Sequence, residues 1–163
     1  MRFFKKNKQQ ADGLSIREDD SPAAQARALA HELYSKRSCC CSEAVLVAIN
    51  EVFHGGLASD HAIRLSSSLC GGIGGSGNTC GALNASIMAA GLLLGRSTPE
   101  EKRSQAGEKA AREIFAAFEK EFGHTICRDL TRNVPRTKRA AHCGDITGRT
   151  AELIAEVLQK HQK

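Results

Sequence analysis

The sequence predicts an all-α protein: a single compact helical domain of about five to six helices, with a glycine-rich loop before its central helix. Its length of 163 residues suits one hydrophobic core. Ala and Leu dominate the apolar residues, whereas the chain has six Phe, one Tyr and no Trp. This composition is more typical of close-packed helices than of a β-sandwich. Apolar residues also recur at helical spacing, and no segment alternates as a strand would.

The helical domain is expected to follow a polar arm. Residues 1–20 are polar and charged and show no periodicity, so we expect them to be disordered and the domain to span residues 21–163. Ser21 and Pro22 are typical of an N-cap and a first helical residue. They predict a first helix that runs to about Arg37.

Two of the predicted helices are apolar on nearly every side. They cover residues 42–53 and 81–94, and because such helices are usually buried, we expect the second of them to be central. A short helix is predicted between them over residues 60–69. The stretch 71–78 is too rich in glycine for a helix or a strand, and it predicts the loop that precedes the central helix.

The C-terminal half is predicted from caps and periodicity. Residues 98–101 match a capping box with proline in the first turn, and they predict the start of a long helix that Gly123 ends. A short turn is expected at residues 128–131. The last helix is predicted over residues 145–160, where apolar residues again recur at helical spacing.

Charge and hydropathy restrict the expected partners and compartment. The formal charge of +5 comes largely from two basic clusters, residues 2–8 and 132–139, which lack interleaved aromatic residues, so we expect no nucleic-acid binding. The start of the chain lacks the apolar segment of a secretory signal. The longest apolar stretch, residues 82–94, is shorter than the roughly 20 residues of a membrane span. We therefore expect a cytoplasmic protein with no membrane partner, whose thiols are kept reduced.

The chain has seven cysteines, which in a reducing compartment indicate metal binding or thiol chemistry. Their odd number excludes complete pairing within one chain. Because a helix N-terminus offers free N–H groups and partial positive charge, it favours the thiolate that reacts or binds metal. The candidate redox thiols and metal ligands are therefore the four cysteines at predicted starts of helices or turns: Cys41, Cys80, Cys127 and Cys143.

Glycines near these cysteines are the candidate cofactor-binding residues. Glycine has no Cβ, so it allows backbone amides to approach sulfur closely. The glycines concerned are Gly71, Gly72, Gly74 and Gly81. The spacing Gly-x-Gly-x-x-Gly over residues 72–77 formally matches a dinucleotide-binding fingerprint. It lacks the preceding strand and the βαβ unit that the fingerprint requires, so we attribute the match to chance.

Other interpretations of the cysteines stay open at this point. Cysteine is also a small apolar residue that fills cores, and this applies to each of the four candidates. Cys70 fits either core packing or an auxiliary thiol near the site. Cys39 and Cys40 could rescue or resolve Cys41 after oxidation, but we favour the interpretation that they are incidental. His124 and His142 lie near candidate cysteines, but a surface position explains them more simply. No Cys-x-x-Cys is present, which argues against a thioredoxin-like motif or an ordinary zinc finger.

From about residue 28 to residue 158 the chain resembles the C_GCAxxG_C_C family of redox-active proteins. The resemblance rests on five segments in this order: residues 41–45, 71–74, 80–82, 127–130 and Cys143. By position, the family's four characteristic cysteines fall on Cys41, Cys80, Cys127 and Cys143. One departure is clear, because the family's Cys-Gly-Ala-x-x-Gly motif has Ala85 here in place of its last glycine.

The resemblance implies redox activity, and the leading hypothesis is an iron–sulfur cluster of the [2Fe–2S] type for electron transfer with a redox partner protein. Four thiolates are the usual ligand set of such a cluster, and the cysteine-bearing part of split-Soret cytochromes is similar. One alternative is metal-free thiol–disulfide exchange by pairs such as Cys41–Cys80 or Cys127–Cys143. Another is a structural zinc site, and the last is a helical binding module in which the cysteines only pack. The apolar helices are compatible with a homodimer.

Overall fold

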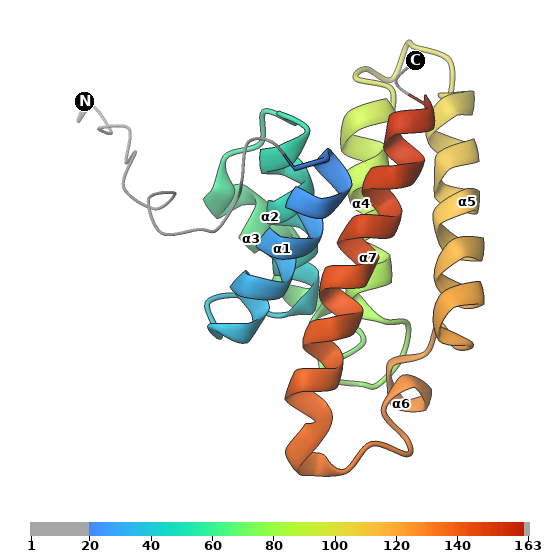
Figure 1. The fold of residues 1–163 in the computed structure, drawn as a ribbon. Coiled ribbons are helices and arrows are strands. Elements are labelled where there is room, and N and C mark those ends of the chain that lie inside the picture. Colours follow the sequence, from blue (N-terminus) through green and yellow to red (C-terminus); the bar gives the residue numbers. More distant parts are fainter. Residues whose placement is uncertain (1–19, 162–163) are drawn as a thin grey trace.

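The computed structural model describes residues 20–161 (Figure 1). Within these residues the chain forms seven α-helices and two short 3₁₀-helices and no strand, which confirms the all-α fold. The predicted arm, residues 1–20, lies outside the described residues apart from Asp20. In chain order the elements are α1 (Pro22–Ser35), α2 (Cys41–Val52), α3 (Ser59–Ser66), η1 (Ser67–Leu69), α4 (Gly81–Leu94), α5 (Gln105–Phe122), α6 (Cys127–Leu130), η2 (Arg136–Lys138) and α7 (Arg139–His161).

The first helices agree with the sequence signals. Pro22 is the first residue of α1, and the side chain of Ser21 accepts a hydrogen bond from the Ala24 N–H (3.3 Å). The two helices that are apolar on nearly every side, α2 and α4, lie within a residue of their predicted bounds. Both are largely buried, as expected for helices without a polar face.

The start of α5 differs from the prediction. The helix begins at Gln105 rather than near Thr98, because Ser104 is its N-cap and accepts a hydrogen bond from the Gly107 N–H (3.1 Å). Glu101 instead accepts a backbone N–H within the preceding loop (2.8 Å). The capping box read from residues 98–101 was therefore wrong: those residues form a turn in the loop that joins α4 to α5.

The start of α7 also differs, and the difference moves a candidate residue. The helix begins at Arg139, six positions before the predicted start at Asp145, because the 3₁₀ turn η2 leads directly into it. The Arg139 side chain also donates to the Val134 carbonyl (3.1 Å), which fixes this entry. Cys143 therefore lies in the second turn of α7. The expectation that it precedes the helix N-terminus was wrong.

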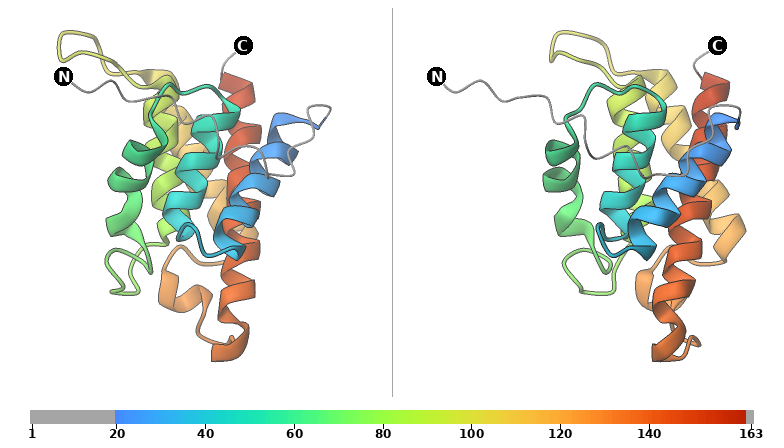
Figure 2. Two further views of the ribbon diagram at one scale, coloured as in Figure 1. Left: turned by 90° about the vertical axis from the view of Figure 1, so that its left-hand side faces the viewer. Right: turned by 60° about the vertical axis from the view of Figure 1, so that its left-hand side comes forward.

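The helices pack around α4. It contacts α2, α5 and α7 (Figure 2). Helix α1 lies along α7 and α2, and α3 packs against α2. Fully buried side chains of this core include Leu46, Leu83, Phe118 and Ile154. No helix in residues 20–161 combines the length and the apolar character that crossing a membrane requires.

Candidate functional site

The four candidate cysteines gather at one end of the bundle, where α6, the glycine-rich loop and the starts of α2, α4 and α7 lie (Figure 1). Cys41 is the first residue of α2, Cys80 is the N-cap of α4, and Cys127 is the first residue of α6. All four are free thiols, either buried or half-buried. Charge on Cys41 contributes to the raised pKa of each of the other three, although no three of these sulfurs in the described residues lie within 4.8 Å of one another.

Two short backbone segments pair side by side and bring two of these cysteines together. One precedes α4 and the other precedes α6. The Cys80 N–H donates to the Thr125 carbonyl (2.8 Å), and the Cys127 N–H donates to the Asn78 carbonyl (2.8 Å). Residues distant in sequence are thereby fixed next to each other, and the fold rather than a short motif assembles the site.

Cys41 lies at the centre of the group. Burial raises the pKa of its thiol, while the N–H groups of Gly71, Ser42 and Ala82 lower it without cancelling the effect of burial. These donors come from the glycine-rich loop, from α2 and from the first turn of α4. Gly81 permits the approach, because a Cβ at that position would lie 2.9 Å from the Cys41 sulfur.

The remaining predicted glycines have different roles in the loop. Gly72 has a left-handed φ of 73°, and a Cβ there would lie 2.6 Å from the Cys127 Cβ, so this glycine lets α6 approach the loop. Gly74 also has a left-handed φ, of 61°, but a Cβ there would meet nothing within 4 Å. The conformation of the turn, not close packing, therefore explains a glycine at this position.

Burial outweighs the helix N-termini in setting the acidity of these thiols. The pKa of Cys80 is raised to about 12, mainly by burial and then by charge on Cys41, against the N–H groups of Leu83 and Ala82. Burial is likewise the main reason that the pKa values of Cys127 and Cys143 are raised. The expectation that positions at helix starts make these thiols ionise readily does not hold for the metal-free protein.

Tyr34 belongs to the site, and the sequence analysis did not identify it. Helices α1 and α7 cross closely, since a Cβ on Gly144 would lie 3.4 Å from the Tyr34 ring and one on Gly148 would lie 3.0 Å from the His31 Cβ. The pKa of Tyr34 is raised to about 12, mainly by burial, with smaller contributions from charge on Cys143 and from a hydrogen bond to that residue. The spacing Gly-x-x-x-Gly in α7 was the available signal for this close crossing.

The family match covers most of the chain. Residues 39–157 match the model of the family described as "Putative redox-active protein (C_GCAxxG_C_C)". The chain belongs to this family. All four candidate cysteines lie within the matched residues of this C_GCAxxG_C_C protein. No match was found among curated proteins or among solved structures.

The structure also locates the departure of this C_GCAxxG_C_C protein from the family motif. Ala85, which replaces the last glycine of that motif, is fully buried in the core on α4. It belongs to the buried hydrophobic core cluster. The substitution lies one turn into the helix from Cys80, away from the hydrogen bonds that join the segments before α4 and α6.

A disulfide joins Cys40 to Cys70, which the sequence analysis did not anticipate. Cys40 had been interpreted as incidental, and that interpretation was wrong. The two residues are 30 positions apart, and no spacing motif links them. Their only sequence signal is position: Cys40 directly precedes Cys41, and Cys70 directly precedes the glycine-rich loop. Cys39 remains a free, buried thiol.

Two histidines near the cysteines have ordinary explanations. His124 is exposed, as predicted. His142 is not a simple surface residue, because its Nε2 lies 3.0 Å from the Leu130 carbonyl, and this contact ties α7 to α6.

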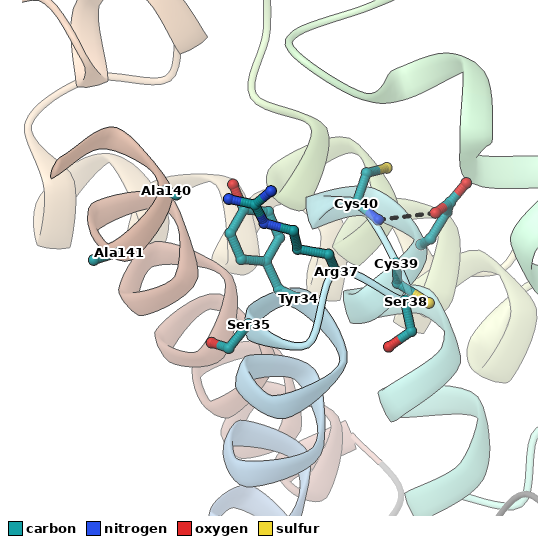
Figure 3. Close-up of a pocket in the computed structure, with 9 residues that line it drawn as sticks. Tyr34, Ser35, Arg37, Ser38, Cys39, Cys40, Ala140 and Ala141 are labelled. Atoms are coloured by element: carbon teal, nitrogen blue, oxygen red, sulfur yellow. Dashed lines mark hydrogen bonds between the residues drawn. The ribbon is translucent and has the colours of Figure 1, made fainter. Parts of the chain in front are cut away.

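A cleft of about 660 Å³ opens beside Tyr34, between the end of α1 and the first turn of α7 (Figure 3). Tyr34 lines this cleft, whereas none of the four candidate cysteines does. Its lining residues are Tyr34, Ser35, Arg37, Ser38, Cys39, Cys40, Glu43, Ala140 and Ala141.

Proposed function

We propose that the protein transfers electrons by means of an iron–sulfur cluster of the [2Fe–2S] type, held by Cys41, Cys80, Cys127 and Cys143. The observation that carries the proposal is the convergence of four free thiols from four helices, with backbone N–H groups aimed at the central sulfur. Four cysteine thiolates are the usual ligands of such a cluster. When bound, the cluster would supply one-electron exchange with a redox partner protein.

The chemistry of the donor set fits this group. In the metal-free protein, burial raises the pKa of all four thiols, and charge on neighbouring cysteines adds to this for Cys80, Cys127 and Cys143, so all four carry their protons at neutral pH. Bound metal ions provide the positive charge that reverses this preference, because a thiol that coordinates a metal is deprotonated outright. Free thiols of high pKa are poorly suited to thiol–disulfide exchange, in which the thiolate is the attacking species.

The residues of the chain around the sulfurs would set the properties of the centre. The N–H groups of Gly71 and Ala82 donate toward Cys41, and the hydroxyl of Tyr34 donates toward Cys143. Hydrogen bonds to ligand sulfurs stabilise added negative charge and raise the reduction potential of a cluster. Burial limits access of solvent and acts in the opposite direction. The balance of these two effects tunes the centre.

The test is anaerobic purification followed by a visible spectrum and by analysis of iron, acid-labile sulfide and zinc in the same sample. We expect a brown protein with iron and sulfide in equal amounts. Cys80→Ser should lose both, whereas Cys39→Ser should keep them, because Cys39 is a buried free thiol whose pKa shift involves none of the four candidates. The two variants make the same chemical change at two buried thiols.

Two results would contradict the proposal. Zinc alone, bound by the same four cysteines, would indicate a structural site instead. A colourless protein that takes up neither iron nor sulfide on reconstitution would favour metal-free thiol exchange, and mapping of disulfides after mild oxidation would then identify the reacting pairs.

A further inference from the structure

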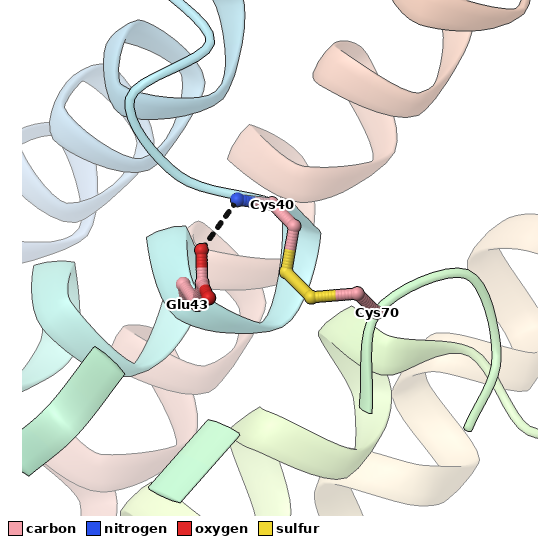
Figure 4. Close-up of side chains that lie close together, drawn as sticks. All are labelled: Cys40, Glu43 and Cys70. Atoms are coloured by element: carbon pink, nitrogen blue, oxygen red, sulfur yellow. Dashed lines mark hydrogen bonds between the residues drawn. A yellow bond between two sulfur atoms is a disulfide. The ribbon is translucent and has the colours of Figure 1, made fainter. Parts of the chain in front are cut away.

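A second group of metal-binding side chains lies beside the four-cysteine site. The side chains of Cys40, Cys70 and Glu43 bring three donor atoms within 4.8 Å of one another (Figure 4). Cys40 is the N-cap of α2, and Cys70 follows η1 at the entry to the glycine-rich loop. In the described part of the chain this is the one group of three such residues that meets so closely.

We propose that Cys40, Cys70 and Glu43 form a redox-switched site for a thiophilic divalent cation such as Zn²⁺. In the oxidised state the two sulfurs form the observed disulfide. In the reduced state the two thiolates and the carboxylate bind the cation. This proposal does not depend on what the four-cysteine site holds.

The backbone geometry suits both states. The Cα atoms of Cys40 and Cys70 are 5.9 Å apart, which lies within the usual range for a disulfide. A tetrahedral zinc with bonds of about 2.3 Å to sulfur holds two thiolates roughly 3.8 Å apart. Because side-chain rotation alone can open the sulfurs to that separation, neither helix nor loop has to move far. Two thiolates and a carboxylate leave a fourth position for water.

Glu43 is already oriented toward the sulfurs. Its Oε2 accepts a hydrogen bond from the Cys40 N–H (2.8 Å), and this fixes the carboxylate over the first turn of α2. Such outer contacts orient ligating carboxylates in metal sites. A carboxylate has two oxygens with about four acceptor positions, so one oxygen can keep the helix cap while the other binds the cation.

The surroundings of the two sulfurs are fixed as well. The Ser42 Oγ lies 3.2 Å from the Cys40 sulfur and 3.5 Å from the Cys70 sulfur. Its own hydroxyl donates to the Ser66 carbonyl (2.9 Å), which holds this side chain between them. Cys40 also occupies the N-cap position of α2.

The switch is balanced in electrons and protons. A dithiol reductant gives two electrons and two protons to the Cys40–Cys70 bond, which breaks to two thiols while the reductant becomes a disulfide. The divalent cation then replaces the two thiol protons, which pass to solvent. Oxidation in the opposite direction requires the cation to leave, so the bound cation protects the reduced pair.

The experiment compares zinc binding by the full-length protein in two states, without oxygen: with the disulfide intact and after reduction by a dithiol that is then removed. Zn²⁺ is the probe, and its bound amount is measured by equilibrium dialysis. We expect the reduced protein to bind one more equivalent than the oxidised protein. Cys70→Ser should abolish this difference. Glu43→Gln, which can keep the helix cap, should weaken the extra site between about 10- and 100-fold.

Matched variants separate this site from the four-cysteine site. Cys39→Ser changes a neighbouring thiol outside the group and should keep the extra equivalent. Cys80→Ser removes a candidate ligand of the other site and should also keep it, whatever happens to iron. Equal zinc in the two redox states of the wild-type protein would overturn the proposal. So would an extra equivalent that persists in Cys70→Ser, or one whose affinity is unchanged in Glu43→Gln.

Discussion

Gly81→Ala tests how the start of α4 is packed against Cys41. A Cβ at this position would lie 2.6 Å from the Leu69 carbonyl oxygen and 2.9 Å from the Cys41 sulfur. The carbonyl belongs to the backbone of η1 and cannot move aside as a flexible side chain can. The added methyl group must therefore displace the start of α4, the sulfur or both.

The size of the effect follows from two opposing contributions. Overpacking of a tightly packed position costs about 1–3 kcal/mol. Replacement of glycine by alanine in a helix returns up to about 1 kcal/mol, and less than this at the first helical residue. We therefore expect Gly81→Ala to lower the free energy of unfolding by about 1–2 kcal/mol. It should also lower the iron content of the purified protein, because the displaced sulfur is a candidate ligand.

Gly91→Ala is the matched control. Gly91 lies in the same helix, and a Cβ there would meet nothing within 4 Å, so alanine should stabilise the protein by about 0.5–1 kcal/mol. Urea unfolding of both variants and the wild-type protein, with the disulfide intact and metal removed, measures the difference directly. If Gly81→Ala were as stable as Gly91→Ala and bound as much iron as the wild-type protein, the close packing of the start of α4 against Cys41 would be contradicted.

Three other changes probe the same end of the bundle. Gly72→Ala and Gly74→Ala both place alanine at a left-handed φ, which costs about 1–2 kcal/mol of strain in each variant. Only the alanine at position 72 also meets an atom of α6, at 2.6 Å. Urea unfolding should therefore show Gly72→Ala to be less stable than Gly74→Ala by about 1–3 kcal/mol. The pKa of Cys80 rises from 9.0 to about 12 on folding, so the metal-free protein should lose stability as the pH increases above about 9. At about pH 10 the raised pKa of Cys80 accounts for a loss of about 1.4 kcal/mol in the free energy of unfolding. Cys80→Ala should remove this contribution when urea unfolding is measured against pH. An unchanged dependence of stability on pH would contradict the burial of this thiol. Tyr34→Phe keeps the ring and removes the hydroxyl that donates toward Cys143, so a redox titration of the iron-loaded protein should give a more negative potential, and an unchanged potential would exclude the hydrogen bond.

Local signals predicted those helices whose ends are determined locally. Ser21 and Pro22 begin α1, and uninterrupted apolar sequences form α2 and α4, because capping and burial act within a few residues. The start of α5 failed because two capping signals compete. Ser104 prevails, since its hydroxyl also hydrogen-bonds the Leu94 carbonyl at the end of α4, a contact that residues 98–101 cannot make and the sequence does not display.

The candidate site shows the same division. Position at the predicted start of a helix selected four cysteines that the structure places at one end of the bundle, although Cys143 lies inside α7. The Cys40–Cys70 bond was not predictable, because it depends on how the glycine-rich loop folds back toward α2. Tyr34 was missed for a related reason: its approach to Cys143 requires the close crossing of α1 and α7.

The glycine-rich loop connects the two cysteine groups through adjacent residues. Cys70 is bonded to Cys40, and the next residue, Gly71, directs its N–H at the sulfur of Cys41, which itself follows Cys40. The Cys40–Cys70 bond therefore joins the residue before Cys41 to the residue before its Gly71 donor. The fold separates the two groups chemically, since one consists of free thiols of raised pKa and the other of a disulfide beside a carboxylate. They meet at the glycine-rich loop, where Gly71 follows the disulfide-bonded Cys70 and donates its N–H to the sulfur of Cys41.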